Sequence, residues 1–201
     1  MKKLMVIVLA TYAFVFSQGF REVAAFQGFT PLEDLAGTYA ATAQGSLFLC
    51  FKGTPPPLPA KCGSEGSVGF PFSVLQVGSA IYDTDGNACA TVTNTSVHLP
   101  VDASPPFVVE VHSVAKVTSY DPTTGTGDAS FTNYVGGQCT GGPFGGRGAL
   151  FDSTGATVAG TGTFHFTASD DGKRIDFVVT SSTNAVGSIG GFSLSGTQLR
   201  Q

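Results

Sequence analysis

Tryptophan is absent from this chain of 201 residues, and charged side chains make up only 12% of it. No basic run follows Lys3, and the formal net charge is −4. Nucleic-acid binding needs clustered Lys and Arg against phosphates, so this composition excludes a nucleic-acid partner. The missing Trp, together with strand patterns rich in Thr, Ser and Asn, also disfavours an outer-membrane barrel, whose lipid-facing bands are apolar and flanked by aromatic girdles.

The chain also lacks the residue spacing of a zinc or phosphate site. Its four cysteines include no Cys-x-x-Cys pair and no Cys/His pair at ligand spacing. The glycine-rich segment 136–148 lacks the Gly-Lys-Ser/Thr ending of a phosphate-binding loop, and it indicates a flexible connection tethered by Cys139. We therefore expect no bound metal and no cofactor.

The first 19 residues have the pattern of a secretory signal peptide. Lys2 and Lys3 precede an apolar run over residues 4–16, which is shorter than the ~20 residues that a membrane-spanning helix needs. Small residues follow, and we expect cleavage after Gly19, with cleavage after Ala25 as the alternative. The pattern predicts a secreted or periplasmic protein without a transmembrane anchor.

Four cysteines in an exported chain indicate two disulfides. Three pairings are open. Cys50 and Cys62 bracket a short Pro-rich stretch that a bridge would close easily, so we favour Cys50–Cys62 together with Cys89–Cys139.

Short turns containing Asp and Gly recur along the chain. Gly is abundant, with 27 residues, and strong helix formers are scarce, so the composition is that of an all-β protein. Each turn is followed directly by a new strand pattern, which is typical of an antiparallel meander. These turns lie at residues 82–87, 120–125, 151–155 and 169–173.

Eight or nine strands in sequence order leave no room for crossover helices. We therefore predict one all-β domain over residues 37–201, an antiparallel up-and-down barrel of about eight strands. A β-sandwich is the alternative, because sequence alone does not distinguish closure from two packed sheets. Residues 20–36 form a lead-in with one short helical turn.

The strand pattern over residues 107–120 alternates most clearly. One face carries small and apolar residues, and we expect it to face the interior. That face holds Val109, Val111, Ser113, Ala115, Val117 and Ser119, and the opposite face includes Glu110 and His112.

The segments 171–179 and 195–201 resemble those of a family of small exported bacterial proteins of unknown function. The same resemblance includes Gly37-Thr-Tyr39, the hairpin 82–87 and the Gly-Thr-rich strand 160–164. The chain also looks like the wider calycin-like group, which includes lipocalins and allene oxide cyclase barrels, although the lipocalin Gly-x-Trp signature is absent. The resemblance implies a barrel and export, and no catalytic residue carries over from it.

Glu110 and His112 are two residues apart on one predicted strand, so their side chains share a face. With His98 or His165 they could form a metal site or an acid/base pair. The favoured interpretation is an exposed polar face, because this parity is opposite to the small, apolar one. His165 is expected to point outward or into the barrel.

Three functions fit this sequence. Two of them need a cavity inside the barrel, and the third does not. The first is binding of a small apolar ligand inside the barrel, with Ser113, Ala115 and Ser119 leaving room and Arg147 at the barrel mouth. The second is an isomerase or cyclase of the allene oxide cyclase-barrel kind. The third is an extracellular interaction protein with a filled barrel. The groups suspected for the enzyme are Glu110, His112, His165 and Tyr134.

Overall fold

The structure is a computed structural model that describes residues 32–53, 58–98, 106–141, 150–184 and 189–201. Within these residues one 3₁₀-helix, η1 (Glu33–Leu35), precedes the strands. The long strands are β1 (Gly37–Lys52), β3 (Ser67–Tyr82), β4 (Asn87–His98), β5 (Phe107–Asp121), β6 (Thr126–Val135), β9 (Thr157–Ala168), β10 (Arg174–Asn184) and β11 (Ile189–Arg200). Three two-residue strands are β2 (Leu58–Pro59), β7 (Gln138–Cys139) and β8 (Phe151–Asp152).

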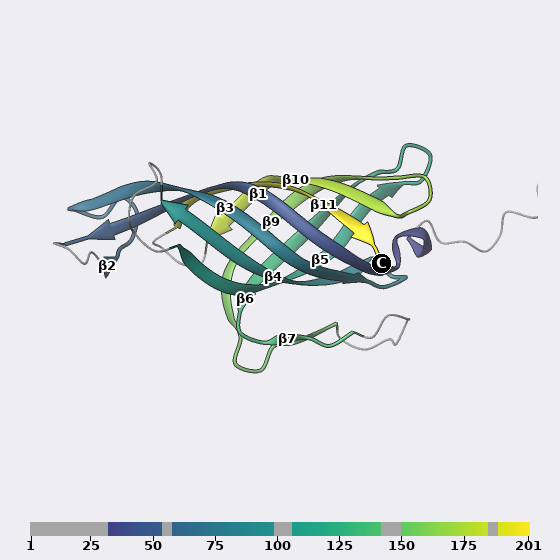
Figure 1. The fold of residues 1–201 in the computed structure, drawn as a ribbon, viewed down its shortest axis with the longest axis horizontal. Coiled ribbons are helices and arrows are strands. Elements are labelled where there is room, and N and C mark those ends of the chain that lie inside the picture. The colour runs from purple at the N-terminus through teal and green to yellow at the C-terminus, as the bar shows by residue number, and fades with distance from the viewer. Residues whose placement is uncertain (1–31, 54–57, 99–105, 142–149, 185–188) are drawn as a thin grey trace, which may run out of the picture. The chain divides into compact units, whose positions relative to one another are not determined.

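The long strands form one antiparallel sheet that closes on itself (Figure 1). Each pairs with the long strands before and after it in the sequence, and β11 pairs with β1 from Tyr39↔Arg200 to Leu49↔Ile189. Closure gives each long strand a partner on both sides, although β10 and β11 pair only from Arg174↔Leu199 to Val178↔Ser195. The predicted up-and-down barrel is therefore confirmed, and the β-sandwich alternative is wrong.

The short strands β2 and β7 lie where the sequence predicted a Pro-rich and a glycine-rich connection. β7 pairs with β8 in a two-stranded sheet of their own, and both belong to the segment that joins β6 to β9 (Figure 1). β2 pairs with the end of β1, within the Pro-rich stretch. In both places a disulfide cysteine lies in or beside the short strand, which brings the chain close enough to pair.

The predicted strands agree closely with those observed. The strand predicted over residues 107–120 is β5, which runs one residue further to Asp121. The single helical turn predicted in the lead-in is η1. The predicted signal peptide and the lead-in up to residue 31 lie outside the described residues.

All four Asp-containing turns form as predicted. In the first, the Asp83 carboxylate accepts hydrogen bonds from the backbone N–H groups of Asp85 at 2.9 Å and Asn87 at 2.8 Å, and Gly86 has φ of 76°. The last turn follows the same scheme, with Gly172 at φ of 62°. A positive φ suits glycine and strains other residues, so these turns depend on their sequence locally. In the other three, the carboxylates of Asp121, Asp152 and Asp171 accept from backbone N–H groups two residues on.

One end of the barrel is filled, and we call it the plugged end. Leu35, from η1, is fully buried in a cluster of inward-facing side chains from several strands. The Tyr39 hydroxyl lies 2.9 Å from the Leu35 carbonyl oxygen and 2.8 Å from the Gly172 carbonyl oxygen, and it donates to them. The Arg200 guanidinium donates to the carbonyl oxygens of Asp34 and Ala36. These bonds fasten η1 to β1, to the turn between β9 and β10, and to β11.

Candidate functional site

The other end of the interior, which we call the cavity end, holds a cavity of about 530 Å³. This volume falls in the range of about 300–1,000 Å³ that is typical of small-molecule sites. Inward-facing positions of nearly every long strand contribute to it, because alternate residues of each strand point to the same face. Its apolar lining includes Leu47, Leu49, Phe51, Phe72, Phe107, Val109, Val111, Phe131, Val135 and Phe192.

The polar groups of this cavity are neutral. Gln76, Asn94, Ser96 and Asn133 lie among the aromatic and aliphatic side chains. The Ser96 hydroxyl donates to the Asn94 side-chain oxygen at 3.3 Å. No carboxylate, imidazole, ammonium or guanidinium group lines the cavity within the part of the chain that the structure describes. Such a lining favours uncharged ligands, because burying an unpaired charge is costly.

A narrower space of about 70 Å³ continues the cavity toward the plugged end. Gln76, Val111, Phe131, Asn133 and Phe192 line both spaces. Many of its lining side chains are small, beside larger ones such as Phe164 and Phe177, and the small ones leave this part unfilled. They include Ala41, Ala43, Ala80, Ala88, Ala90, Ser113 and Ala115.

Two of the predicted ligand contacts, Ser113 and Ala115, line this narrow space. Ser119 lies beyond a register shift between Val117 and itself, and its hydroxyl donates to the exposed Asp128 carboxylate at 3.0 Å. The bulge reverses the expected parity, so Ser119 lies on the outer side of the barrel. Arg147 is outside the described residues.

Gln198 of β11 lines the narrow space and is only 7% exposed. Its side chain hydrogen-bonds to the Tyr82 hydroxyl. Burial raises the pKa of Tyr82, and this hydrogen bond opposes the rise. The sequence interpretation missed Gln198 and Gln76. The available signal was the inward parity of their strands, where a glutamine among apolar and small residues is unusual.

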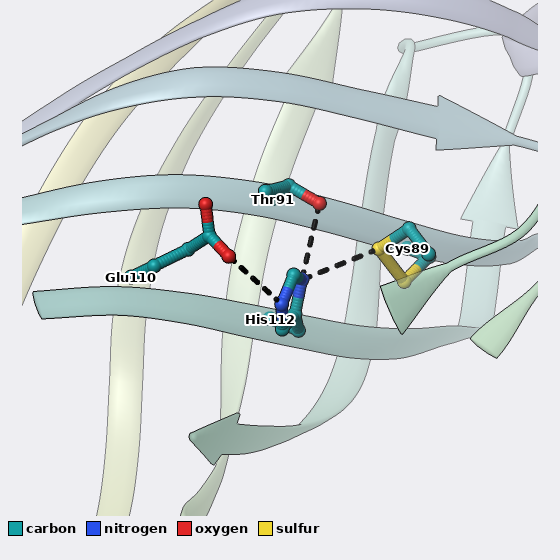
Figure 2. The surroundings of a disulfide bond; sticks show 5 residues. Cys89, Thr91, Glu110 and His112 are labelled. Carbon is teal, nitrogen blue, oxygen red and sulfur yellow. Dashed lines mark hydrogen bonds and ion pairs between the residues drawn. A yellow bond between two sulfur atoms is a disulfide. The ribbon is translucent and has the colours of Figure 1, made fainter. Parts of the chain in front are cut away.

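Glu110, His112 and Tyr134 lie together, but on the outer face of the barrel. His112 of β5 and Tyr134 of β6 are register partners. Figure 2 shows His112 between Glu110 and Thr91: its Nε2 is 3.4 Å from a Glu110 carboxylate oxygen, and its Nδ1 is 3.1 Å from the Thr91 hydroxyl. The prediction that the Glu110–His112 parity points away from the interior is confirmed.

His112 is nevertheless only 4% exposed, so the expectation of an exposed polar face is wrong for this residue. Cys139 of β7 places its Sγ 4.0 Å from His112 Nδ1, and the Phe151 ring of β8 lies 6.0 Å from the imidazole, between centroids. Phe151 also contacts the Tyr134 ring, at 4.7 Å between centroids. The imidazole is thus a packing surface for β7 and β8, closed to a substrate.

Both predicted disulfides are present. Cys50 pairs with Cys62, and Cys89 pairs with Cys139. The second bridge holds β7 against β4 beside His112 (Figure 2). Two disulfides fit a protein of an oxidising compartment.

His165 points outward from β9, away from the cavity and from the His112 cluster. Its Nδ1 lies 3.0 Å from a carboxylate oxygen of Asp128, and both side chains are about half exposed. The hydrogen bond from His165, with a second from Ser119, lowers the pKa of Asp128. Of the two orientations predicted for His165, outward and into the barrel, the structure shows the outward one.

A larger open hollow of about 1010 Å³ lies on the outer wall beside Tyr134 and Phe151. Hydroxyl side chains of β6, β9 and β10 cover much of it, and some bond to each other, as Thr161 does to Thr183 at 2.7 Å. These hydroxyls satisfy one another across neighbouring strands. The hollow therefore offers a ligand fewer free groups than its size suggests.

No protein-family model matches this chain, and no curated protein matches it significantly.

Among the residues described, no cluster of three or more His, Cys, Asp and Glu side chains has the arrangement of a metal site. In the same residues, no helix has the length and hydropathy to cross a bilayer. The barrel interior is the candidate site that geometry alone supports.

Proposed function

We propose that this protein is an exported barrel of the calycin-like kind that binds a small, neutral, largely apolar ligand in its interior. The observation that carries the proposal is the cavity of about 530 Å³, lined by aromatic and aliphatic side chains with a few uncharged polar groups. Burial of apolar surface contributes about 25 cal/mol per Å², so a ligand that fills this space gains its affinity mainly from the hydrophobic effect.

The position of the acid–base groups favours binding over catalysis. Glu110, His112, Tyr134 and His165, the groups suspected for an isomerase or cyclase, lie on the outer face. A general acid or base must reach its substrate within about 3 Å, directly or through one water. A ligand inside the barrel is therefore out of reach of all four.

A pair of neighbouring substitutions tests the proposal. Val109 lines the cavity, whereas Val108, the preceding residue of β5, is exposed. Val109→Trp fills part of the cavity, and Val108→Trp adds the same side chain outside. The natural chain has no Trp, so each variant also carries a single indole reporter.

The measurement is the fluorescence increase of the neutral dye N-phenylnaphthylamine, with native mass spectrometry of molecules that co-purify. We expect the dye to bind the natural protein and Val108→Trp alike and to bind Val109→Trp at least tenfold more weakly. Equal binding by both variants would place the ligand outside the barrel. Conversion of a bound molecule by the natural protein, lost in Glu110→Ala or His112→Ala, would favour the enzyme.

A further inference from the structure

An unsatisfied acceptor lies at the inner end of the barrel interior. Gln198 is 7% exposed, and its Oε1 atom has no hydrogen-bond partner among the described residues. Since Oε1 has no partner, the amide nitrogen is the end of the side chain that bonds to the Tyr82 hydroxyl. The carbonyl oxygen remains free beside the narrow space of about 70 Å³.

Leaving such a group unpaired is costly. A buried acceptor without a partner loses its hydrogen bonds to water and gains none in return, and native structures contain few such groups. A donor entering the narrow space would remove this cost. The space is continuous with the main cavity through the lining residues common to both, so a molecule bound at the cavity end can reach it.

The surroundings of Gln198 restrict what that donor can be. The narrow space is walled by alanines such as Ala41, Ala43 and Ala80, so it admits a small group and excludes a bulky ring. The other polar residues beside it, Gln76, Ser113 and Asn133, are uncharged. A carboxylate would offer only acceptors to the Gln198 oxygen and would be buried without a counter-charge.

We propose that the inner end of the cavity receives the hydrogen-bond donor of the ligand, and that the ligand class is a neutral, apolar alcohol whose hydroxyl donates to Gln198 Oε1. The apolar remainder of the molecule then fills the cavity end among Phe51, Phe72 and Phe192. This inference rests on the proposed function, since it concerns the orientation and the class of the same ligand.

Three probes of equal chain length test the inference: decanol, decyl methyl ether and decanoic acid, each displacing N-phenylnaphthylamine. A neutral hydrogen bond contributes about 0.5–1.5 kcal/mol, so the alcohol should bind about 2- to 12-fold more tightly than the ether. The acid at neutral pH should bind more weakly than either. Equal affinities of the alcohol and the ether for the natural protein would overturn the inference. That result is expected if a water molecule, and not the ligand, donates to Gln198.

Gln198→Met removes the acceptor and keeps the size of the side chain. In this variant the alcohol should lose its advantage while the ether binds as before. Gln44→Met, on the exposed outer face of β1, is the matched control and should keep the preference. A preference that persists in Gln198→Met overturns the inference. If that variant does not fold, the three probes on the natural protein decide. Failure of every probe and of the dye to bind would instead contradict the proposed function.

Discussion

The two ends of one barrel differ in what fills them. At the plugged end the inward-facing side chains pack around Leu35 and Tyr39, and η1 is tied down by Tyr39 and Arg200. At the cavity end the same strands leave about 530 Å³ unfilled, and several large apolar side chains are exposed. These exposed residues are Phe48, Val68, Phe107, Val108, Val135 and Val158.

The comparison teaches that strand alternation alone does not determine whether a barrel is filled. Apart from the shifts at bulges, inward-facing and outward-facing residues alternate along each strand, but small residues and neutral amides replace large side chains beyond the plug. Stability is therefore concentrated at one end, and the capacity to bind at the other. The following predictions test that division.

The largest effect is expected from matched truncations at the two ends. Leu35→Ala at the plugged end removes a fully buried side chain, and it should lower the free energy of unfolding by about 2–5 kcal/mol. Leu49→Ala, in the half-buried cavity lining, should lower it by less than about 1.5 kcal/mol, since the site is already open. Urea unfolding measures both, and equal losses would contradict the division.

The two disulfides provide the next comparison. Cys50–Cys62 closes a separation of 12 residues beside the cavity end, and Cys89–Cys139 closes 50 residues against the outer wall. In the chain-entropy model, these loops contribute about 3 and about 4 kcal/mol. Replacement of Cys89 and Cys139 by Ser should therefore lower the melting temperature more than replacement of Cys50 and Cys62. Alkylation of the unreduced natural protein should label no cysteine.

Tyr39→Phe tests the fastening of the plug. The ring is kept, but the hydroxyl that donates to the carbonyl oxygens of Leu35 and Gly172 is lost. Buried acceptors left unpaired cost about 1–3 kcal/mol, so stability should fall by that amount. Tyr134→Phe keeps the ring contact with Phe151 on the outer wall and should change stability by less than about 0.5 kcal/mol. Dye binding should be unchanged in both variants.

The smallest expected effect is that of pH, which should change the stability of the fold but not the affinity for the ligand. Hydrogen bonds from backbone or side chains lower the pKa of Asp121, Asp128, Asp152, Asp171 and Asp176 below the ordinary value of 3.8. In each case the folded state binds a proton less readily than the unfolded chain. The stabilisation is therefore complete above that value and is lost as the pH falls through the lowered pKa.

We expect the urea midpoint to decrease modestly below about pH 4, because these carboxylates are exposed and screened by solvent. Affinity for the neutral dye should stay constant between about pH 5 and 8, since no charged group lines the cavity. A dye affinity that titrates in this interval would indicate an ionisable group in contact with the ligand.

Much of the fold could be predicted from local sequence. An Asp that bonds to the backbone two residues on and a Gly with positive φ are sufficient to specify a turn, and all four turns were identified. Alternation then gave the strands and the inward parity of Ser113 and Ala115. The parity failed at Ser119, because a bulge depends on pairing with another strand as well as on its own sequence.

The candidate site was less accessible to sequence reasoning. Glu110, His112 and Tyr134 do lie together, but the burial of His112 comes from Cys139 and Phe151, which are distant in sequence. Gln198 became important only through its depth and its bond to Tyr82, over a hundred residues earlier in the chain. Strand parity could have placed Gln198 inside the barrel, but neither its bond to Tyr82 nor the burial of His112 leaves a signature in the local pattern of residues.

The sequence by itself determined the turns, most of the strands and the all-β class, because each rests on interactions between near neighbours or on spacing. It left three cysteine pairings open, and the structure decided for the favoured one. Only the tertiary structure decided that β11 closes on β1, that one end is plugged by Leu35, and that a neutral cavity remains at the other. Closure and packing join residues from opposite ends of the chain. The space left between side chains is a property of all the strands together, and no single strand contains it.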